Sequence, residues 1–127
     1  MIDGTNFELV GDFMEAFGQK VEVEPTWPDF NTRELRIDLI QEEFQELQDA
    51  IDQKDMVEIA DALTDILYVV YGAGHAFGID LDSCFDEVHA SNMSKLNEDG
   101  SVNYDENGKV LKSPNFHLPD LESILNP

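Results

Sequence analysis

With 127 residues and a formal net charge of −21 at pH 7, the sequence describes a short, strongly acidic protein, and its length suits a single domain over residues 1–127. The acidity argues against DNA, RNA or an anionic membrane as a partner, because binding their phosphates requires clustered Lys and Arg. The single cysteine cannot form an intrachain disulfide and no apolar run is long enough to cross a membrane, so we expect a cytoplasmic protein.

The first part of the chain predicts two helices separated by a proline-containing loop. Apolar residues repeat at helical spacing over residues 6–17, and Gly18 is suited to end this first helix. After the loop, Asn31 and Glu34 have the spacing of a capping box, which predicts that a second helix starts at Asn31. The apolar periodicity of this second helix continues to residue 52.

The remainder predicts two longer helices, a hairpin and one closing helical turn. The short turn at residues 53–55 leads into a third helix that ends at Gly78, so helices two and three should pack antiparallel. A fourth helix covers residues 81–96, and Asn107-Gly108 between two short β-like runs indicates a β-hairpin. We therefore expect an all-α bundle of four to five helices with a small C-terminal β-hairpin.

Three acidic residues follow one stripe of the third helix, which is otherwise strongly apolar. They are Glu58, Asp61 and Asp65. Burying an unpaired carboxylate costs on the order of several kcal/mol, and neighbouring carboxylates also repel one another. A group that compensates these charges is therefore expected opposite the stripe.

The second helix adds carboxylates at the seam between the two helices. Glu43 and Glu46 fall between its packing face and its solvent face, and antiparallel pairing brings them close to Glu58 and Asp61. Four converging carboxylates either take up protons or share a hard cation. Oxygen ligands favour Mg²⁺, with Mn²⁺ as a substitute, over zinc. We interpret the seam as a divalent metal site, and the alternative is that Glu43 and Glu46 are simply solvated.

The fourth helix turns polar along its buried stripe. Asn92 and Lys95 continue that stripe, and Lys109 and Lys112 follow in the C-terminal part of the chain. One interpretation of Lys95 is structural, with its ammonium beside the last carbonyls of the helix. We favour the other interpretation, in which these side chains contact an anion held by the metal. A nucleoside polyphosphate would suit both the metal and the lysines.

These motifs together resemble a known enzyme family. EExxE at residues 42–46 and ExxD at residues 58–61, followed by ADALTDILYV, EVHASNMSKL and GKVLKSPNFHLPDL, are similar to MazG-type all-α nucleoside triphosphate pyrophosphohydrolases. The tail resembles their short, single-domain members that are like phosphoribosyl-ATP pyrophosphohydrolases. The resemblance implies hydrolysis of (deoxy)nucleoside triphosphates between the α and β phosphates, giving a monophosphate and pyrophosphate, in nucleotide-pool control or housekeeping.

The resemblance also implies roles for individual residues. The implied Mg²⁺ ligands are Glu43, Glu46, Glu58 and Asp61. Glu42, beside these ligands, would position or activate water, and Lys95 would assist departure of pyrophosphate. The implied contacts to phosphate or nucleotide are Asn92, Lys95, Lys112 and Lys109. The resemblance implies a homodimer or a dimer of dimers, and the third helix, which is apolar on more sides than one small domain can cover, likewise predicts a dimer.

Two alternatives for the function stay open. Phosphoribosyl-ATP is the main alternative substrate, although its second ribose phosphate would need more fixed cations than this sequence offers. Arg36, about two turns before Glu43 on the same side of the helix, could reach a substrate; otherwise it forms a surface salt bridge with Asp38 or Glu34. The second alternative is an acidic helical module that binds nucleotides without catalysis.

Overall fold

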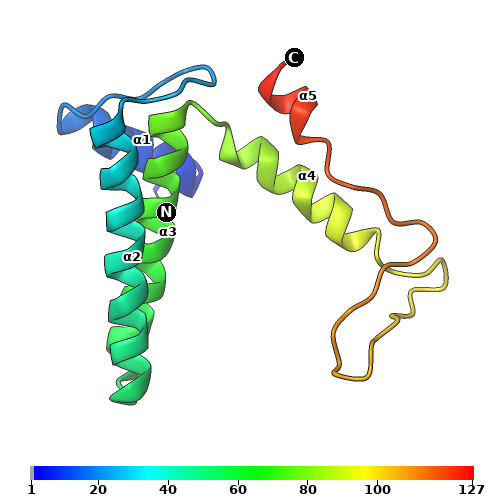
Figure 1. The fold of residues 1–127 in the computed structure, drawn as a ribbon. Coiled ribbons are helices and arrows are strands. Elements are labelled where there is room, and N and C mark those ends of the chain that lie inside the picture. Colours follow the sequence, from blue (N-terminus) through cyan, green and yellow to red (C-terminus); the bar gives the residue numbers. More distant parts are fainter. Residues whose placement is uncertain (1) are drawn as a thin grey trace. The chain divides into compact units, whose positions relative to one another are not determined.

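The computed structural model describes residues 2–127, and these residues form five α-helices and no β-sheet (Figure 1). The helices are α1 (Asn6–Ala16), α2 (Phe30–Asp52), α3 (Met56–Phe77), α4 (Leu81–Met93) and α5 (Leu121–Leu125). The chain divides into two compact units, with the boundary after Leu81. The predicted all-α class is confirmed. None of the helices in residues 2–127 has the length and apolar character needed to span a membrane.

The first unit is built on an antiparallel hairpin of α2 and α3. Helix α1 packs against this hairpin by contacting α3 (Figure 1). The turn between the two long helices is tight. The amide of Gln53 donates to the carbonyl of Asp49, that of Asp55 donates to Ala50, and Lys54 adopts a positive φ of 55°. Asp55 then caps α3 by accepting from the Glu58 amide at 3.2 Å. The predicted hairpin of helices is confirmed.

The start of α2 differs from the prediction. Asp29, not Asn31, is the N-cap, and its carboxylate accepts from the Thr32 amide at 2.8 Å. Both residue types are good caps, but Asp29 has the extended backbone that an N-cap requires, while Asn31 already lies inside the helix. The helix therefore begins one residue earlier, at Phe30, than the capping-box spacing indicated.

The loop between α1 and α2 is tied to the end of α3. The amides of Glu22 and Thr26 donate to the carbonyls of His75 and Phe77, each at 2.9 Å. Gly78 ends α3 in the left-handed conformation, with a φ of 69°, and the Glu24 carbonyl lies where a Cβ would stand. These contacts hold the loop against the helix end and fix the walls of a pocket described below.

The second unit contains α4, a long connecting segment and the short α5. Helix α4 ends at Met93, so the predicted extension to residue 96 was wrong and Lys95 lies in the turn that follows. The predicted β-hairpin was also wrong, because only one antiparallel bridge, between Tyr104 and Val110, is formed there. The Asp105 carboxylate accepts from the amides of Asn107 and Lys109. These bonds stabilise the turn that the bridge closes.

Candidate functional site

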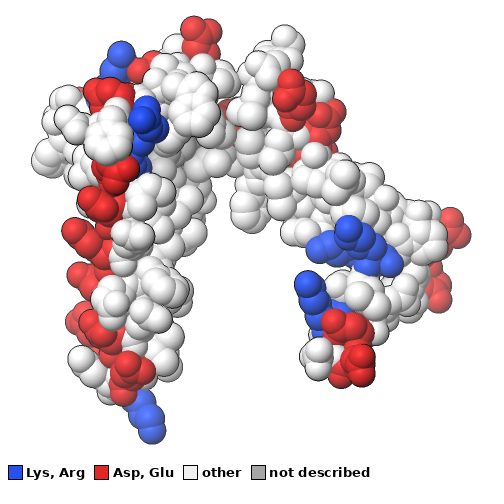
Figure 2. All heavy atoms as spheres, in the orientation of Figure 1, with Lys and Arg blue, Asp and Glu red and all other residues white. Residues whose placement is uncertain are grey.

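Three carboxylates from α2 and α3 converge on one side of the helical hairpin. Oxygen atoms of Glu43, Glu46 and Asp65 all lie within 4.8 Å of one another. Glu43 and Glu46 are close to one turn apart on α2, and Asp65 faces them from α3. Acidic side chains gather along the α2–α3 hairpin in Figure 2. We call Glu43, Glu46 and Asp65 the acidic cluster.

The acidic cluster is electrostatically strained. The pKa of Glu43 is raised to about 7, first by burial and then by a hydrogen bond with Glu46 and by the negative charges of Glu46, Asp65 and Asp61. Burial, followed by the charges of Asp61 and Glu46, also raises the pKa of Asp65. These carboxyls therefore favour protons or a cation in their midst.

One atom of the cluster lacks a partner altogether. Oε2 of Glu43 is buried and makes no hydrogen bond with any of residues 2–127. A buried acceptor without a partner is costly, and a hard cation would satisfy it together with the neighbouring carboxylates. The donor set consists of oxygen atoms alone, which suits Mg²⁺ or Mn²⁺ rather than a thiophilic metal. The residues present therefore fit a divalent metal ion.

The other two predicted ligands lie beside the cluster. Glu58 and Asp61 line a pocket of the hairpin together with Glu46. The charge of Asp61 also contributes to the raised pKa values of Glu43 and Asp65. The structure thus brings Glu46, Glu58 and Asp61 to one pocket, and Glu46 belongs to both groups.

Asp65 was missing from the predicted ligand set. The sequence signal was present, because Asp65 continues the stripe of Glu58 and Asp61, but the ExxD motif stops at Asp61. The geometry of the hairpin explains why Asp65 lies in the acidic cluster. Glu43 and Asp65 are equally far along the chain from Lys54, in the turn, so an antiparallel pair of helices places them opposite each other.

The remaining predicted residues are distributed between the two units. Glu42 is exposed beside Glu43 on α2. The other four are in the second unit: Asn92, Lys95, Lys109 and Lys112. There, the Ser113 hydroxyl donates to the Ser94 carbonyl at 2.8 Å, which ties the chain beside Lys112 to the chain beside Lys95. Lysine side chains gather on this unit in Figure 2.

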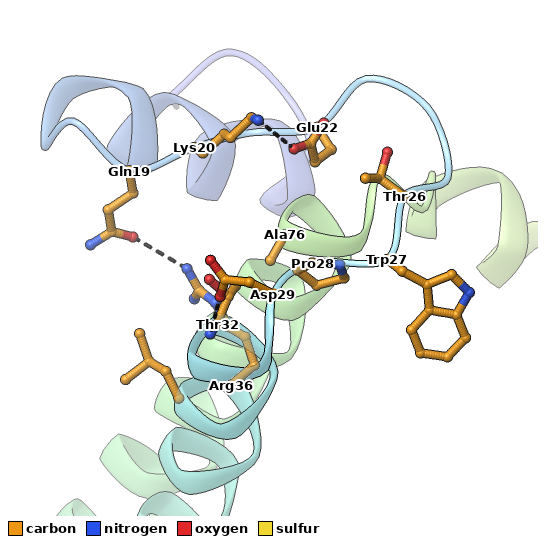
Figure 3. Close-up of a pocket in the computed structure, with 11 residues that line it drawn as sticks. Gln19, Lys20, Glu22, Thr26, Trp27, Pro28, Asp29, Thr32, Arg36 and Ala76 are labelled. Carbon is orange, nitrogen blue, oxygen red and sulfur yellow. Dashed lines mark hydrogen bonds and ion pairs between the residues drawn. The ribbon is translucent and has the colours of Figure 1, made fainter.

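Arg36 lies in a different pocket of the first unit. This pocket has a volume of about 400 Å³ and is lined by residues of the α1–α2 loop, the first turns of α2 and Ala76 (Figure 3). Arg36 is buried, so the surface salt bridge with Asp38 or Glu34 is wrong, and Arg36 forms no ion pair with any of residues 2–127. It precedes Glu43 by about 10 Å along the helix axis, and no carboxylate of the acidic cluster lines its pocket.

Comparison with known proteins points to one family. The model of the family described as "Phosphoribosyl-ATP pyrophosphohydrolase" matches residues 10–92, about two thirds of the chain. The protein "Uncharacterized protein L479" of Acanthamoeba polyphaga mimivirus is 38% identical over 113 residues. The match covers 86% of this chain and 43% of the viral protein, so the chain spans less than half the length of this relative. The residues matched by the family include α2 and α3, which carry the acidic cluster.

Proposed function

The chain belongs to the phosphoribosyl-ATP pyrophosphohydrolase family, and we propose on this basis that it is a metal-dependent pyrophosphohydrolase of nucleoside triphosphates. The observation that carries the proposal is the acidic cluster with the unpartnered Oε2 of Glu43. A protein with 28 acidic residues gains nothing structurally from crowding carboxylates at a helix seam. A cation bound there for a polyphosphate substrate would explain why these carboxylates lie so close together.

The proposed metal ligands are four of the five carboxylates in the two motifs and the additional Asp65. They are Glu43, Glu46, Glu58, Asp61 and Asp65. Bound Mg²⁺, or Mn²⁺ in its place, supplies Lewis-acid chemistry that neutralises charge on the phosphates. The carboxylates would hold the metal ion at the seam. Without the positive charge of the ion, a protein of net charge −21 would repel the substrate.

The proposed reaction is attack of water on the α-phosphorus. The new bond joins the water oxygen to the α-phosphorus, and the bond from that phosphorus to the bridging oxygen breaks, giving a nucleoside monophosphate and pyrophosphate. Glu42, exposed next to Glu43, would orient the water and accept its proton. Lys95 would offset the charge that develops on the leaving pyrophosphate.

Asn92, Lys109 and Lys112 are the further residues proposed to contact the substrate. Asn92 offers an amide, and Lys112 and Lys109 offer ammonium groups that suit phosphate oxygens. The hydrogen bond from Ser113 to the Ser94 carbonyl supports a joint role for Lys95 and Lys112, because it fixes the two segments that carry them.

Ordinary nucleoside triphosphates are our preferred substrates, with a role in nucleotide-pool control or housekeeping. The name of the matching family favours phosphoribosyl-ATP as the second candidate. That substrate carries an additional phosphate, and the arginines of the first unit are poorly placed for it. Arg33 donates to the Pro28 carbonyl at 2.8 Å, and Arg36 is buried.

A substrate panel with resolved products tests the proposal. The panel contains the eight common nucleoside triphosphates, dUTP and phosphoribosyl-ATP, each with Mg²⁺, and products are separated by chromatography. We expect a monophosphate and pyrophosphate from at least one nucleoside triphosphate. Glu46→Gln and Asp61→Asn should each lower the rate at least about a hundredfold, whereas Asp38→Asn, an exposed acid on the same helix as Glu46, should not.

Three outcomes would contradict parts of this proposal. Release of orthophosphate would refute the reaction. A strong preference for phosphoribosyl-ATP would refute the substrate choice and leave the reaction standing. Stabilisation of the fold by Mg²⁺ and nucleotide without any release of pyrophosphate would favour a binding module that is not an enzyme.

A further inference from the structure

Arg36 is a buried cation whose charge is not balanced by an ion pair within residues 2–127. Its side chain is only 9% exposed in a chain with 28 acidic residues. Nη2 donates to Oε1 of Gln19 over a long 3.5 Å, and Nε has no hydrogen-bond partner in the described part of the chain. Burial lowers the pKa of Arg36, yet a guanidinium stays protonated in proteins. A buried charge without an ion pair is costly unless a bound ligand of opposite charge balances it.

The fold holds this guanidinium beside a preformed pocket. A Cβ on Gly72 would come within 2.6 Å of Nη1, so the glycine on α3 makes the space that Arg36 occupies. The opposite wall is the α1–α2 loop, whose Glu22 and Thr26 amides are bonded to the end of α3. Figure 3 shows the Arg36 side chain directed toward Gln19 on this loop. The pocket is therefore a feature of the packed unit rather than of one side chain.

The charges that line the pocket limit what it can bind. Lys20 and Glu22 form an ion pair at 3.1 Å and offset each other. Asp29 is kept ionised because hydrogen bonds from Thr32 lower its pKa. With Arg36 these groups carry two positive and two negative charges, so the lining is formally neutral. A single negative charge is acceptable beside Arg36, whereas a polyphosphate or a dianion would meet Glu22 and Asp29.

We propose that the pocket beside Arg36 binds a small molecule through a monoanionic carboxylate. A guanidinium presents its N–H donors in a fixed, planar fork that matches the oxygens of a carboxylate. The ligand would replace the long bond that Nη2 makes to Gln19. Nε is buried and is not exposed to the pocket, so the contact is made at the end of the guanidinium. The site is about 10 Å along α2 from Glu43 and does not depend on the proposed hydrolysis.

The test follows the Arg36 side chain directly in the full chain. The protein is labelled with ¹⁵N-arginine, divalent metals are removed with a chelator, and sodium acetate is titrated at constant ionic strength set with sodium chloride. We expect acetate to shift the Arg36 Nε–H signal saturably and to raise the Tm, with no such shift from chloride. The signal is assigned by its loss in Arg36→Lys.

Variants separate a ligand site from a structural arginine. Arg36→Lys keeps the charge without the fork and should weaken acetate binding about tenfold. Arg36→Met keeps the apolar stem and should lose the acetate response entirely, while its Tm in chloride equals or exceeds that of the wild type because a buried charge is gone. Arg33→Met removes a charge from the same helix outside the pocket and should keep the full response.

Four results would overturn the proposal. The first is an Arg36 signal that acetate does not move, and the second is an unchanged acetate response in Arg36→Met. The third is a stronger response to sulfate than to acetate, which would refute the choice of a monoanion. The fourth is an Nε shift that grows with protein concentration without acetate, which would assign the carboxylate to an acidic side chain of a second copy.

Discussion

At the scale of single residues, the sequence motifs identified some members of the acidic cluster and missed another. The motifs identified Glu43 and Glu46 because their spacing places both on one edge of α2. They did not identify Asp65, since its partner Glu43 is distant in sequence and the pair meets only through the antiparallel packing of two helices. The burial of Arg36 was missed for the same reason, because it depends on Gly72 and on the α1–α2 loop.

Asp65 should therefore contribute to metal binding. We expect Asp65→Asn to weaken the binding of Mn²⁺ at least about tenfold, because it removes one carboxylate from a group whose oxygens lie within 4.8 Å. Titration calorimetry measures this affinity. Asp38→Asn, an exposed acid on α2 away from the cluster, is the matched control and should bind Mn²⁺ as the wild type does. Equal affinities for Asp65→Asn and the control would remove Asp65 from the site.

Glu43 should make the metal-free protein less stable as the pH rises. Its folded-state pKa of about 7 lies above the ordinary value of 4.5, so the folded state binds more protons than the unfolded state between these values. Stability then falls as the pH increases through that window. Urea unfolding with chelator present, at a series of pH values, measures the slope. Glu43→Gln should flatten it, and an unchanged slope in that variant would show that Glu43 is not its source.

At the scale of secondary structure elements, prediction succeeded where one local signal was strong and failed where two competed. Helix α3 ends at Gly78 as predicted, because a glycine in the left-handed conformation is a strong helix stop signal. The start of α2 was misplaced because Asp29 and Asn31 are both good caps. The β-hairpin failed because the turn signal at Asn107-Gly108 was right but the runs on either side form a single bridge, between Tyr104 and Val110.

Two glycines with the same backbone conformation should differ sharply in their tolerance of alanine. Gly18 and Gly78 have φ values of 74° and 69°, but only Gly78 would place a Cβ against the Glu24 carbonyl. We expect Gly18→Ala to lower the free energy of unfolding by about 1 kcal/mol, from backbone strain alone. Gly78→Ala should cost about 2 kcal/mol more, because the loop must also move. Urea unfolding of both variants measures the difference, and equal losses would argue against a rigid loop contact.

At the scale of the whole molecule, the first unit leaves many apolar side chains uncovered. Leu63, Leu67 and Val70 on α3 are between 37% and 50% exposed, although they belong to the most apolar helix of the chain. Scattered apolar residues on a surface are ordinary, but a run of them along one helix is typical of an interface. This exposure supports the predicted homodimer or dimer of dimers.

Disrupting that face should reduce self-association. We expect light scattering to show a dimer or tetramer at micromolar concentration, and Leu63→Lys to shift the equilibrium toward the monomer because a charge would be buried at the interface. Val23→Lys introduces the same charge on a loop residue that is 95% exposed and should leave the assembly unchanged. A monomeric wild type would refute the prediction, and an unaffected Leu63→Lys would place the interface elsewhere.

The turn at residues 53–55 has an evolutionary consequence. Surface turns usually accept insertions freely, but this one sets the register between α2 and α3. One added residue that extended α3 at its start would rotate the rest of that helix by about 100°, carrying Asp61 and Asp65 away from Glu43 and Glu46. We therefore expect the length of this turn to be more constrained than its amino acids, so that homologues diverge at Gln53 and Lys54 by substitution rather than by indels.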